Sequence, residues 1–230
     1  MTMVEGGTMT GTDCTLVIGD KNYSSWSLRP WLALKACGAS FDEERIRLRQ
    51  PDSKPEIFRH SPSGKVPALK TDIGVIYDSL AIVEYLAEQY PEARLWPKDA
   101  AARAAARSIS AEMHAGFQAL RNDMPMDLIS SLPMPALSET LRANIGRVVS
   151  IWRDTRMRFG QDGPFLLGAF TNADAMYAPV ATRFRTYGVP LSDFGDDGTA
   201  AAYVDTIYAM PEMTEWVANA DAEMRERELV

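Results

Sequence analysis

Three short segments in the first 80 residues carry hydroxyl, amide and charged groups suited to holding a small charged molecule. The first is Asn22-Tyr23-Ser24-Ser25-Trp26-Ser27, which lies between a predicted strand and a predicted helix. Hydroxyls at a helix start cap its free N–H groups, and those groups together with the helix dipole favour a nearby anion. A thiolate is such an anion, because a hydroxyl that donates to a thiol's sulfur lowers a pKa that starts near ~8.5. With three serines in the segment, one can cap the helix while another acts on a ligand.

The other two segments have the same character. Ser63-Gly64-Lys65-Val66-Pro67-Ala68-Leu69 places a proline at the start of a predicted strand, where its missing N–H is tolerated and where cis bonds occur. A cis bond before Pro67 would leave the N–H and C=O of Val66 to an extended, peptide-like ligand. In Tyr77-Asp78-Ser79, both Asp78 and Ser79 can cap the following helix, and their side chains can also hold an amine and a carboxylate.

Short strands and helices in alternation are predicted to position these segments. Strands are expected at 14–18, 41–48, 66–70 and 74–77, where apolar and β-branched runs end at turn residues. Helices are expected at 28–37, with Gly38 as its C-cap, and at 79–90, with a short irregular helix at 55–58. This order indicates an α/β domain.

Beyond a proline-bounded connection at 91–97, the strand signals largely disappear. Prolines within 124–137 exclude a continuous helix there. Helices are predicted at 99–121, 138–159, 172–187, 200–210 and 212–228. The expected organisation is a flexible tail at 1–13, an α/β domain at 14–92, a linker at 93–98 and an all-helical domain at 99–230.

Composition excludes several classes of protein. The 230 residues include 24 Lys+Arg and 31 Asp+Glu, and the net charge of −7 argues against a general nucleic-acid binder. No apolar run reaches the ~18 residues of a membrane span, and the N-terminus does not resemble a secretion signal, so a cytoplasmic protein is expected. The acidic excess lies in residues 193–230, which hold ten acidic and two basic residues and are expected to form a solvated terminal face.

The few cysteines and histidines argue against a metal centre or a disulfide framework. Cys14 and Cys37 do not form a Cys-x-x-Cys pair, and His60 and His114 have no cluster of carboxylates or thiols around them. Reduced cysteines and no metal are therefore expected.

Taken together, the three segments resemble the thioredoxin-like N-terminal domain of the glutathione transferases. Order and spacing match over about residues 14–92, through Tyr23-Ser24-Ser25, Gly64-Lys65-Val66-Pro67-Ala68-Leu69 and Asp78-Ser79-Leu-Ala-Ile-Val-Glu-Tyr-Leu86. Leu166-Leu-Gly168-x-x-Thr171-x-x-Asp174 looks like the capping box of the core helix in that family's second domain. Among classes the chain looks most like zeta, which includes maleylacetoacetate isomerases, although zeta proteins carry Ser-Ser-Cys in place of Tyr23-Ser24-Ser25-Trp26.

The resemblance implies a domain that binds glutathione beside a helical domain that walls a second-substrate pocket. The backbone of Val66 would pair with the cysteinyl unit of glutathione, and Lys65 would lie near its glycine carboxylate. Asp78 and Ser79 would hold the γ-glutamyl end. The glutathione-binding residues that the resemblance implies are Lys65, Val66, Pro67, Asp78 and Ser79.

A hydroxyl from the first segment would hold the glutathione thiol as a thiolate. The register of the segment against the first helix favours Ser24, with Ser25 next. Some classes of the family use a tyrosine from this neighbourhood, so Tyr23 stays open as well.

A second-substrate pocket is expected beside the helix predicted at 99–121. Met113, Phe117, Leu120 and Met124 form an apolar stripe there, a pattern that more often reflects helix packing than a pocket. Beside the stripe, His114 and Arg121 could orient an anionic or carbonyl electrophile, although His114 is more simply a structural histidine. Trp26 could cover either ligand. The candidate pocket residues are Trp26, Met113, His114, Phe117 and Arg121.

The function implied is that of a homodimeric glutathione transferase, which conjugates glutathione to small hydrophobic electrophiles in detoxification. Glutathione would be the co-substrate. Two alternatives stay open: a glutathione-dependent isomerase, lyase or dehalogenase on the same scaffold, and a non-catalytic glutathione-binding module.

Overall fold

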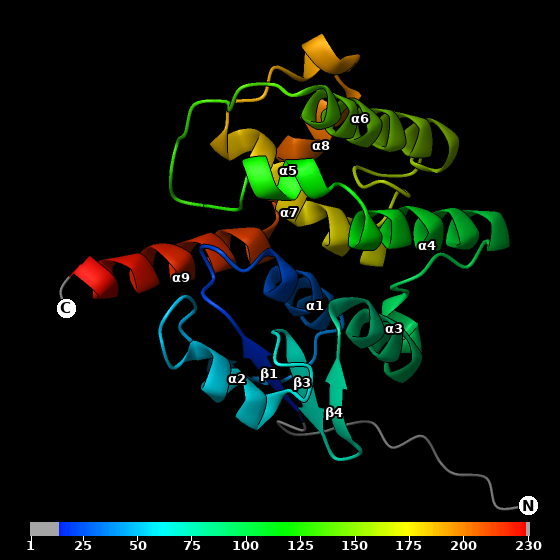
Figure 1. The fold of residues 1–230 in the computed structure, drawn as a ribbon. Coiled ribbons are helices and arrows are strands. Elements are labelled where there is room, and N and C mark those ends of the chain that lie inside the picture. The colour runs from blue at the N-terminus through cyan, green and yellow to red at the C-terminus, as the bar shows by residue number, and fades with distance from the viewer. Residues whose placement is uncertain (1–13, 229–230) are drawn as a thin grey trace, which may run out of the picture.

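The computed structural model describes residues 14–228, which form a small mixed sheet on one side of a bundle of helices (Figure 1). The four strands lie in the order β2-β1-β3-β4. β1 runs parallel to β2 and antiparallel to β3, and β3 runs antiparallel to β4. Their bounds are β1 Thr15–Ile18, β2 Asp42–Arg45, β3 Ala68–Thr71 and β4 Gly74–Tyr77. The predicted strands are therefore present, and three of them are shorter than expected.

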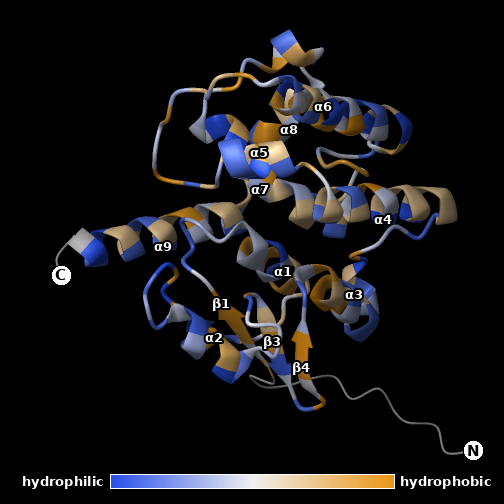
Figure 2. Ribbon diagram, viewed as in Figure 1, coloured by the Kyte–Doolittle hydropathy of each residue, from blue (hydrophilic) through white to orange (hydrophobic). Residues whose placement is uncertain are grey.

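Helices cover both faces of this sheet (Figure 1). Successive side chains of a strand point to opposite faces, so Leu16 and Ile18 of β1 cluster with residues of α1 (Ser25–Ala36) and α3 (Ser79–Gln89). Val17 instead clusters with a residue of α2 (Ser53–His60). β1 and β4 stand out as hydrophobic in Figure 2. Residues 15–89 thus form the expected α/β unit.

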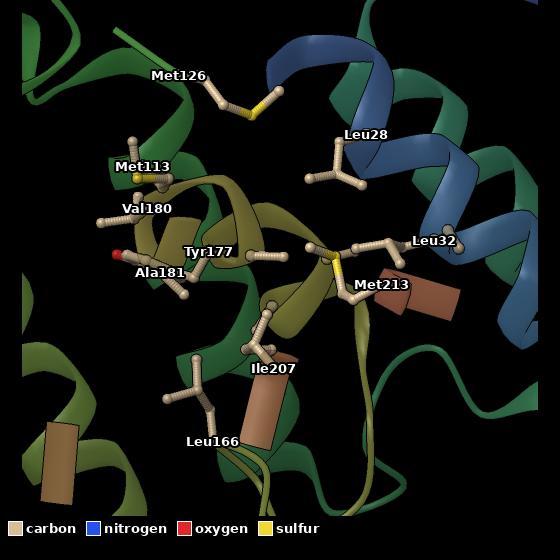
Figure 3. Packing of buried hydrophobic residues seen from close by; sticks show 14 of the residues in the cluster. Leu28, Leu32, Met113, Met126, Leu166, Tyr177, Val180, Ala181, Ile207 and Met213 are labelled. Carbon is tan, nitrogen blue, oxygen red and sulfur yellow. The ribbon is translucent and has the colours of Figure 1, made fainter. Parts of the chain in front are cut away.

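The second half of the chain is helical. α7 is its central element, since all of its residues except Arg185 are buried. Leu28 and Leu32 of α1 lie beside Tyr177 of α7, and a single apolar core joins the sheet side to the helical side (Figure 3). The helices are α4 Ala100–Ala115, α5 Gln118–Asp123, α6 Glu139–Phe159, α7 Asn172–Thr186, α8 Thr199–Tyr208 and α9 Pro211–Glu228, with short 3₁₀ helices at Pro91–Ala93 and Leu191–Phe194.

The single helix predicted at 99–121 is wrong, because the chain breaks it at Gly116. A Cβ at this position would meet the carbonyl oxygen of Glu112 at 2.9 Å, and the next residue, Phe117, has a left-handed backbone with φ of 60°. α4 therefore ends at Ala115 and α5 begins at Gln118. The apolar stripe does not lie on one helix; its four residues are all buried in the core.

The acidic C-terminal segment is also not a simple solvated face, as the sequence had suggested. α9 lies along the α/β unit (Figure 1), and several of its carboxylates pair with that unit. Glu215 pairs with Lys35 at 2.7 Å, and the buried Glu223 pairs with Arg45 at 3.3 Å. The carboxylate of Glu223 also accepts the backbone N–H of Lys21 at 2.9 Å. The acidic segment therefore neutralises part of the first domain.

We expect Glu223→Ala to lower the free energy of unfolding by about 2–3 kcal/mol, because it leaves a buried backbone N–H without an acceptor and removes a partner of Arg45. Urea unfolding measures the change. Glu226→Ala is the matched control, since Glu226 pairs with the same arginine but its side chain is 68% exposed; it should cost less than about 1 kcal/mol. Equal losses in the two variants would contradict the role given to Glu223.

Two sequence expectations concern the chain ends and the membrane. The flexible tail expected at 1–13 lies outside the described residues. Between residues 14 and 228, none of the helices combines the length and apolar character that crossing a membrane requires.

Candidate functional site

The segment between β1 and α1 folds into a turn that ends in a helix cap. The N–H groups of Tyr23 and Ser24 donate to the carbonyl of Asp20 at 3.1 and 2.8 Å. Ser24 is the N-cap of α1, and its hydroxyl accepts the N–H of Ser27 at 3.4 Å. The helix thus begins at Ser25, three residues before the predicted start, because the cap lies further upstream than the apolar periodicity indicates.

The hydroxyls of Ser24 and Ser27 form a hydrogen-bonded pair in which either can be the donor. The N–H of Gly19 donates to the Ser27 hydroxyl at 3.1 Å, and the Ser27 and Ser24 hydroxyl oxygens lie 2.7 Å apart. Both oxygens also accept a backbone N–H, so either hydroxyl can donate to the other; in one of the two arrangements Ser27 donates to Ser24. The proton of Ser24 is then left for a further acceptor.

The two other hydroxyl candidates have different surroundings. The buried Ser25 makes no hydroxyl hydrogen bond within residues 14–228. The ring of Tyr23 lies against two guanidinium groups, those of Arg49 at 5.3 Å and Arg227 at 5.7 Å. Tyr23 is therefore engaged in cation–π contacts.

A cavity of about 770 Å³ lies between the α/β unit and the α4–α5 region. Such a volume suits a small-molecule ligand. Eight residues singled out from the sequence line it: Trp26, Lys65, Val66, Pro67, Asp78, Ser79, His114 and Arg121. Ser63 and Tyr77, which belong to two of the segments singled out from the sequence, line it as well, and three further residues were not anticipated: Ala115, Gln118 and Asn122. Gln118 and Asn122 lie four residues apart within α5, a spacing that places both on one face of that helix.

The remaining candidates do not line this cavity. Tyr23, Ser24 and Ser25 belong to the turn next to Trp26, which does line it, and Ser24 is only 5% exposed. Met113 and Phe117 pack in the apolar core instead. For Met113 and Phe117, the structure therefore agrees with helix packing and not with a pocket.

The α/β side of the cavity presents backbone and capping groups. The Val66–Pro67 peptide is cis. Val66 also lies before the β3–β4 ladder, which starts at Ala68. Asp78 caps α3 by accepting the N–H of Leu80 at 2.9 Å, and its second oxygen lies 3.5 Å from Nε2 of His114. The N-terminus of α3 therefore opens toward the cavity with Ser79 beside it.

Comparison with known proteins decides the family. A family model for the glutathione S-transferase N-terminal domain matches residues 23–89. Maleylacetoacetate isomerase of Rattus norvegicus is 31% identical over 175 residues, which cover 74% of this chain and 77% of that protein. The chain belongs to the glutathione S-transferase family. A probable maleylacetoacetate isomerase of Caenorhabditis elegans is 38% identical over 106 residues, 46% of this chain and about half of the relative's length, at 49%.

A solved structure supports the fold of this family member across nearly its whole length. A glutathione transferase homolog from Burkholderia gl BGR1, solved with bound glutathione, superposes with a TM-score of 0.68. It covers 91% of this chain and 98% of its own, at 23% sequence identity. The α/β thioredoxin-like domain followed by an all-helical domain is thereby confirmed.

The chain also buries two arginine side chains whose burial the sequence did not indicate. Arg29 of α1 is fully buried, and its Nε, Nη1 and Nη2 atoms have no hydrogen-bond partner within residues 14–228. Burial lowers the pKa of Arg29 to about 9, helped by the positive charges of Arg183 and Arg121. Burial likewise lowers the pKa of Arg183 to about 10. Two buried arginines, on α1 and α7, thus lie near each other and near Arg121 of α5.

In residues 14–228, the cysteines form no disulfide, and the side chains that can ligate a metal form no metal site. Cys14 and Cys37 are not joined in a disulfide, and burial raises the pKa of Cys37 to about 12. Between residues 14 and 228, no group of three or more His, Cys, Asp or Glu side chains is placed to hold a metal ion.

Proposed function

We propose that this family member is a glutathione transferase that uses the cavity beside α3 to bind glutathione and supply its thiolate to a small electrophile. The observation that carries the proposal is the set of groups gathered on one wall: a helix N-terminus, a lysine and a free strand end. Glutathione is an extended tripeptide with two carboxylates and an amine, and these groups complement it.

Each residue of that wall receives one part of the tripeptide in this proposal. The backbone of Val66 pairs with the cysteinyl unit, next to Pro67, as a strand end pairs with an added strand. Ser79 and the N-terminus of α3 hold the γ-glutamyl carboxylate, and Asp78 receives the amine. The exposed Lys65 lies at the same cavity and meets the glycine carboxylate.

Thiol activation is assigned to the Ser24 turn. In this proposal the Ser27 hydroxyl donates to Ser24, one of the two directions open to the pair, and the Ser24 hydroxyl donates its proton to a thiolate at the start of α1. Ser25 is the second choice because its hydroxyl has no partner within residues 14–228. Hydrogen bonding to the sulfur and the helix dipole both stabilise the thiolate form.

A second candidate function, a glutathione-dependent isomerase, is favoured by the relatives. The rat and nematode proteins are named maleylacetoacetate isomerases, and a relative from Ralstonia sp is named maleylpyruvate isomerase. The two candidates share the glutathione wall and the activating hydroxyl. They differ in whether the sulfur stays on the product, so a transferase consumes glutathione and an isomerase regenerates it.

Calorimetry with glutathione, followed by assays on an electrophile panel, tests these functions. We expect saturable glutathione binding and the loss of one glutathione per product molecule formed. Product formation without glutathione consumption would instead establish the isomerase. Binding without any turnover would indicate a non-catalytic module, and the absence of binding would overturn every glutathione-dependent function.

We also propose that the chain forms a homodimer. In this proposal the dimer is located in the cytoplasm and acts in detoxification. The edge strand β4 carries Val75 and Tyr77, which are 40% and 45% exposed, and Ile73 before it is 72% exposed. Apolar side chains on an unpaired edge favour association with another surface. Light scattering coupled to size-exclusion chromatography would reveal a monomer if this proposal fails.

A further inference from the structure

Asn22 joins the Ser24 turn to the helical domain. Its side chain is fully buried, two residues before Ser24. The amide oxygen accepts the backbone N–H groups of Leu128 and Ile129 at 2.7 and 3.2 Å. The amide nitrogen donates to Oδ1 of Asp127 at 2.9 Å. One side chain thus makes three hydrogen bonds to a segment that lies 105 to 107 positions away in the sequence.

The segment that Asn22 contacts is itself fastened to α7. The carbonyl of Asp127 accepts the hydroxyl of Thr186, the last residue of α7, at 2.7 Å. The N–H of Leu132 donates to the carbonyl of Thr186 at 2.8 Å. Because α7 is the buried central helix of its domain, residues 127–132 give the asparagine a fixed support.

Asn22 also belongs to the turn that places Ser24. The N–H groups of Tyr23 and Ser24 both donate to the carbonyl of Asp20, at 3.1 and 2.8 Å, so residues 20–24 close into one turn. A buried amide that loses its partners is costly, which leaves the turn one favourable position. A displacement of Asn22 would therefore displace Ser24 as well.

The local structure of the turn does not explain a buried asparagine at this position. The turn closes through backbone groups, and α1 is capped by the hydroxyl of Ser24. An apolar side chain could fill a buried site without the cost of desolvating an amide, whereas a fully bonded amide specifies one arrangement. We propose that Asn22 is a positioning residue, which sets the Ser24 hydroxyl at hydrogen-bonding distance from the glutathione sulfur.

This role rests on the proposed function and adds a contribution of the helical domain to it. The wall assigned to glutathione, with Val66 and Ser79, belongs to the α/β unit. The hydroxyl assigned to thiol activation is instead fixed from the helical domain through Asn22. Loss of the Asn22 contacts should therefore impair activation of the thiol and spare the binding of glutathione.

An exchange of hydrogen-bonding partners tests this role. Asn22→Asp sets a carboxylate against that of Asp127, so the turn should move. The pKa of the bound glutathione thiol, obtained from its thiolate absorbance, should rise toward the free value near ~8.5. kcat/KM on the electrophile panel should fall about tenfold, since small misplacements of a catalytic group are costly. Adding Asp127→Asn restores the bond with donor and acceptor reversed, and should restore both quantities.

The double variant separates position from charge. A new carboxylate near the sulfur would raise the thiol pKa by repulsion alone, and the double variant keeps that carboxylate at position 22. A pKa that stays raised after Asp127→Asn is added would therefore overturn the positioning role.

Two further measurements distinguish positioning from binding and from general stability. The affinity for S-methylglutathione, which has no free thiol, should stay within about twofold in Asn22→Asp, because the wall that holds the tripeptide is unchanged. Without any ligand, the amide hydrogens of Tyr23 and Ser24 should exchange about tenfold or more faster in Asn22→Asp than in the wild type, because the turn has lost its support.

Asn172→Ala is the matched control. Asn172 is also a fully buried asparagine that joins the two domains, since its amide nitrogen donates to the carbonyl of Val83 at 3.0 Å. Its replacement should lower stability in urea unfolding, as Asn22→Asp does, but should leave the pKa of the bound thiol at the wild-type value.

A variant Asn22→Asp that loses stability yet keeps the wild-type thiol pKa and amide exchange would reduce Asn22 to a structural role. If this variant does not fold, Asp127→Ala carries the same comparison from the half-buried partner, with at least a twofold loss of kcat/KM expected. Failure of the proposed function would be seen in the wild type itself, as no binding of S-methylglutathione or no lowering of the thiol pKa. Amide exchange would still measure the effect of Asn22 on the turn.

Discussion

Replacing Ser24 with alanine is expected to return the pKa of the bound glutathione thiol toward its free value near ~8.5 and to lower kcat/KM about 10²-fold. The Ser24 oxygen accepts the N–H of Ser27 and lies 2.7 Å from the Ser27 hydroxyl, so the Ser24 proton is free for the sulfur when Ser27 is the donor of that pair. Without the hydrogen bond from this hydroxyl, only the N-terminus of α1 stabilises the thiolate. Titration of thiolate ultraviolet absorbance in the complex gives the pKa, and steady-state assays give kcat/KM.

Two neighbouring substitutions act as controls for Ser24. Ser25→Ala removes a hydroxyl of the same size one residue away, and Tyr23→Phe removes the phenol that lies against Arg49 and Arg227. Both should leave the thiol pKa close to the wild-type value. A raised pKa in Ser25→Ala together with an unchanged pKa in Ser24→Ala would transfer the activating role to Ser25.

Replacing Asp174 with alanine should destabilise the protein by about 3–5 kcal/mol, the largest loss of stability that we expect from one substitution. Asp174 is fully buried at the start of α7. Its Oδ1 accepts the N–H of Leu166 and the hydroxyl of Tyr203, both at 3.0 Å. Its Oδ2 accepts the N–H and hydroxyl of Thr171 at 2.8 and 3.0 Å. Alanine would leave these buried donors without an acceptor.

Asp174 should also make stability depend on pH. Burial raises its pKa from 3.8 to about 6, against the opposing effect of its hydrogen-bond donors. The folded protein then holds a proton that the unfolded chain releases, so this group stabilises the fold fully below pH ~4 and loses that contribution as pH rises through ~6. The advantage of the wild type over Asp174→Asn should therefore be about 2–3 kcal/mol larger at acidic than at neutral pH.

Urea unfolding of both proteins across this pH range measures the difference. Thr206→Ala serves as a control for loss of a side-chain hydrogen bond on an exposed helix surface, since its hydroxyl bonds only the carbonyl of Ala202. It should change stability by about 1 kcal/mol or less, with no pH dependence. A wild-type advantage that grows toward neutral pH would show that the carboxylate is ionised in the folded protein throughout.

Local signals explain why much of the fold was predictable from the sequence. The Thr171–Asp174 capping box is present as predicted, because its two residues lie three apart and need no distant partner. Apolar or β-branched residues bounded by turns mark β1, β3 and β4, whereas β2 is the charged Asp-Glu-Glu-Arg; all four strands were found to within a few residues. The helix at 99–121 was predicted wrongly because Gly116 alone gave no sign of the close approach to Glu112.

The candidate site was predictable where it consists of caps and strand ends, and not where tertiary contacts create it. Asp78 and Ser79 could be located from their place before a helix. Arg29 could not be identified, because it lies within a helical pattern and becomes buried only when α1 meets α7, some 150 residues later. The same holds for Glu223, whose partner Lys21 lies 202 positions away.

That last contact bears on how the protein is made. During synthesis, the strands and helices of the α/β unit are complete well before α9 exists, yet α9 supplies Glu223 to the Lys21 N–H and Arg227 to the carboxylate of Asp20, whose carbonyl anchors Ser24. Contacts of such sequence separation form late in folding. A nascent first domain would therefore have its sheet, but the turn that we propose to activate the thiol would lack its support until α9 has docked, and full activity would begin only then.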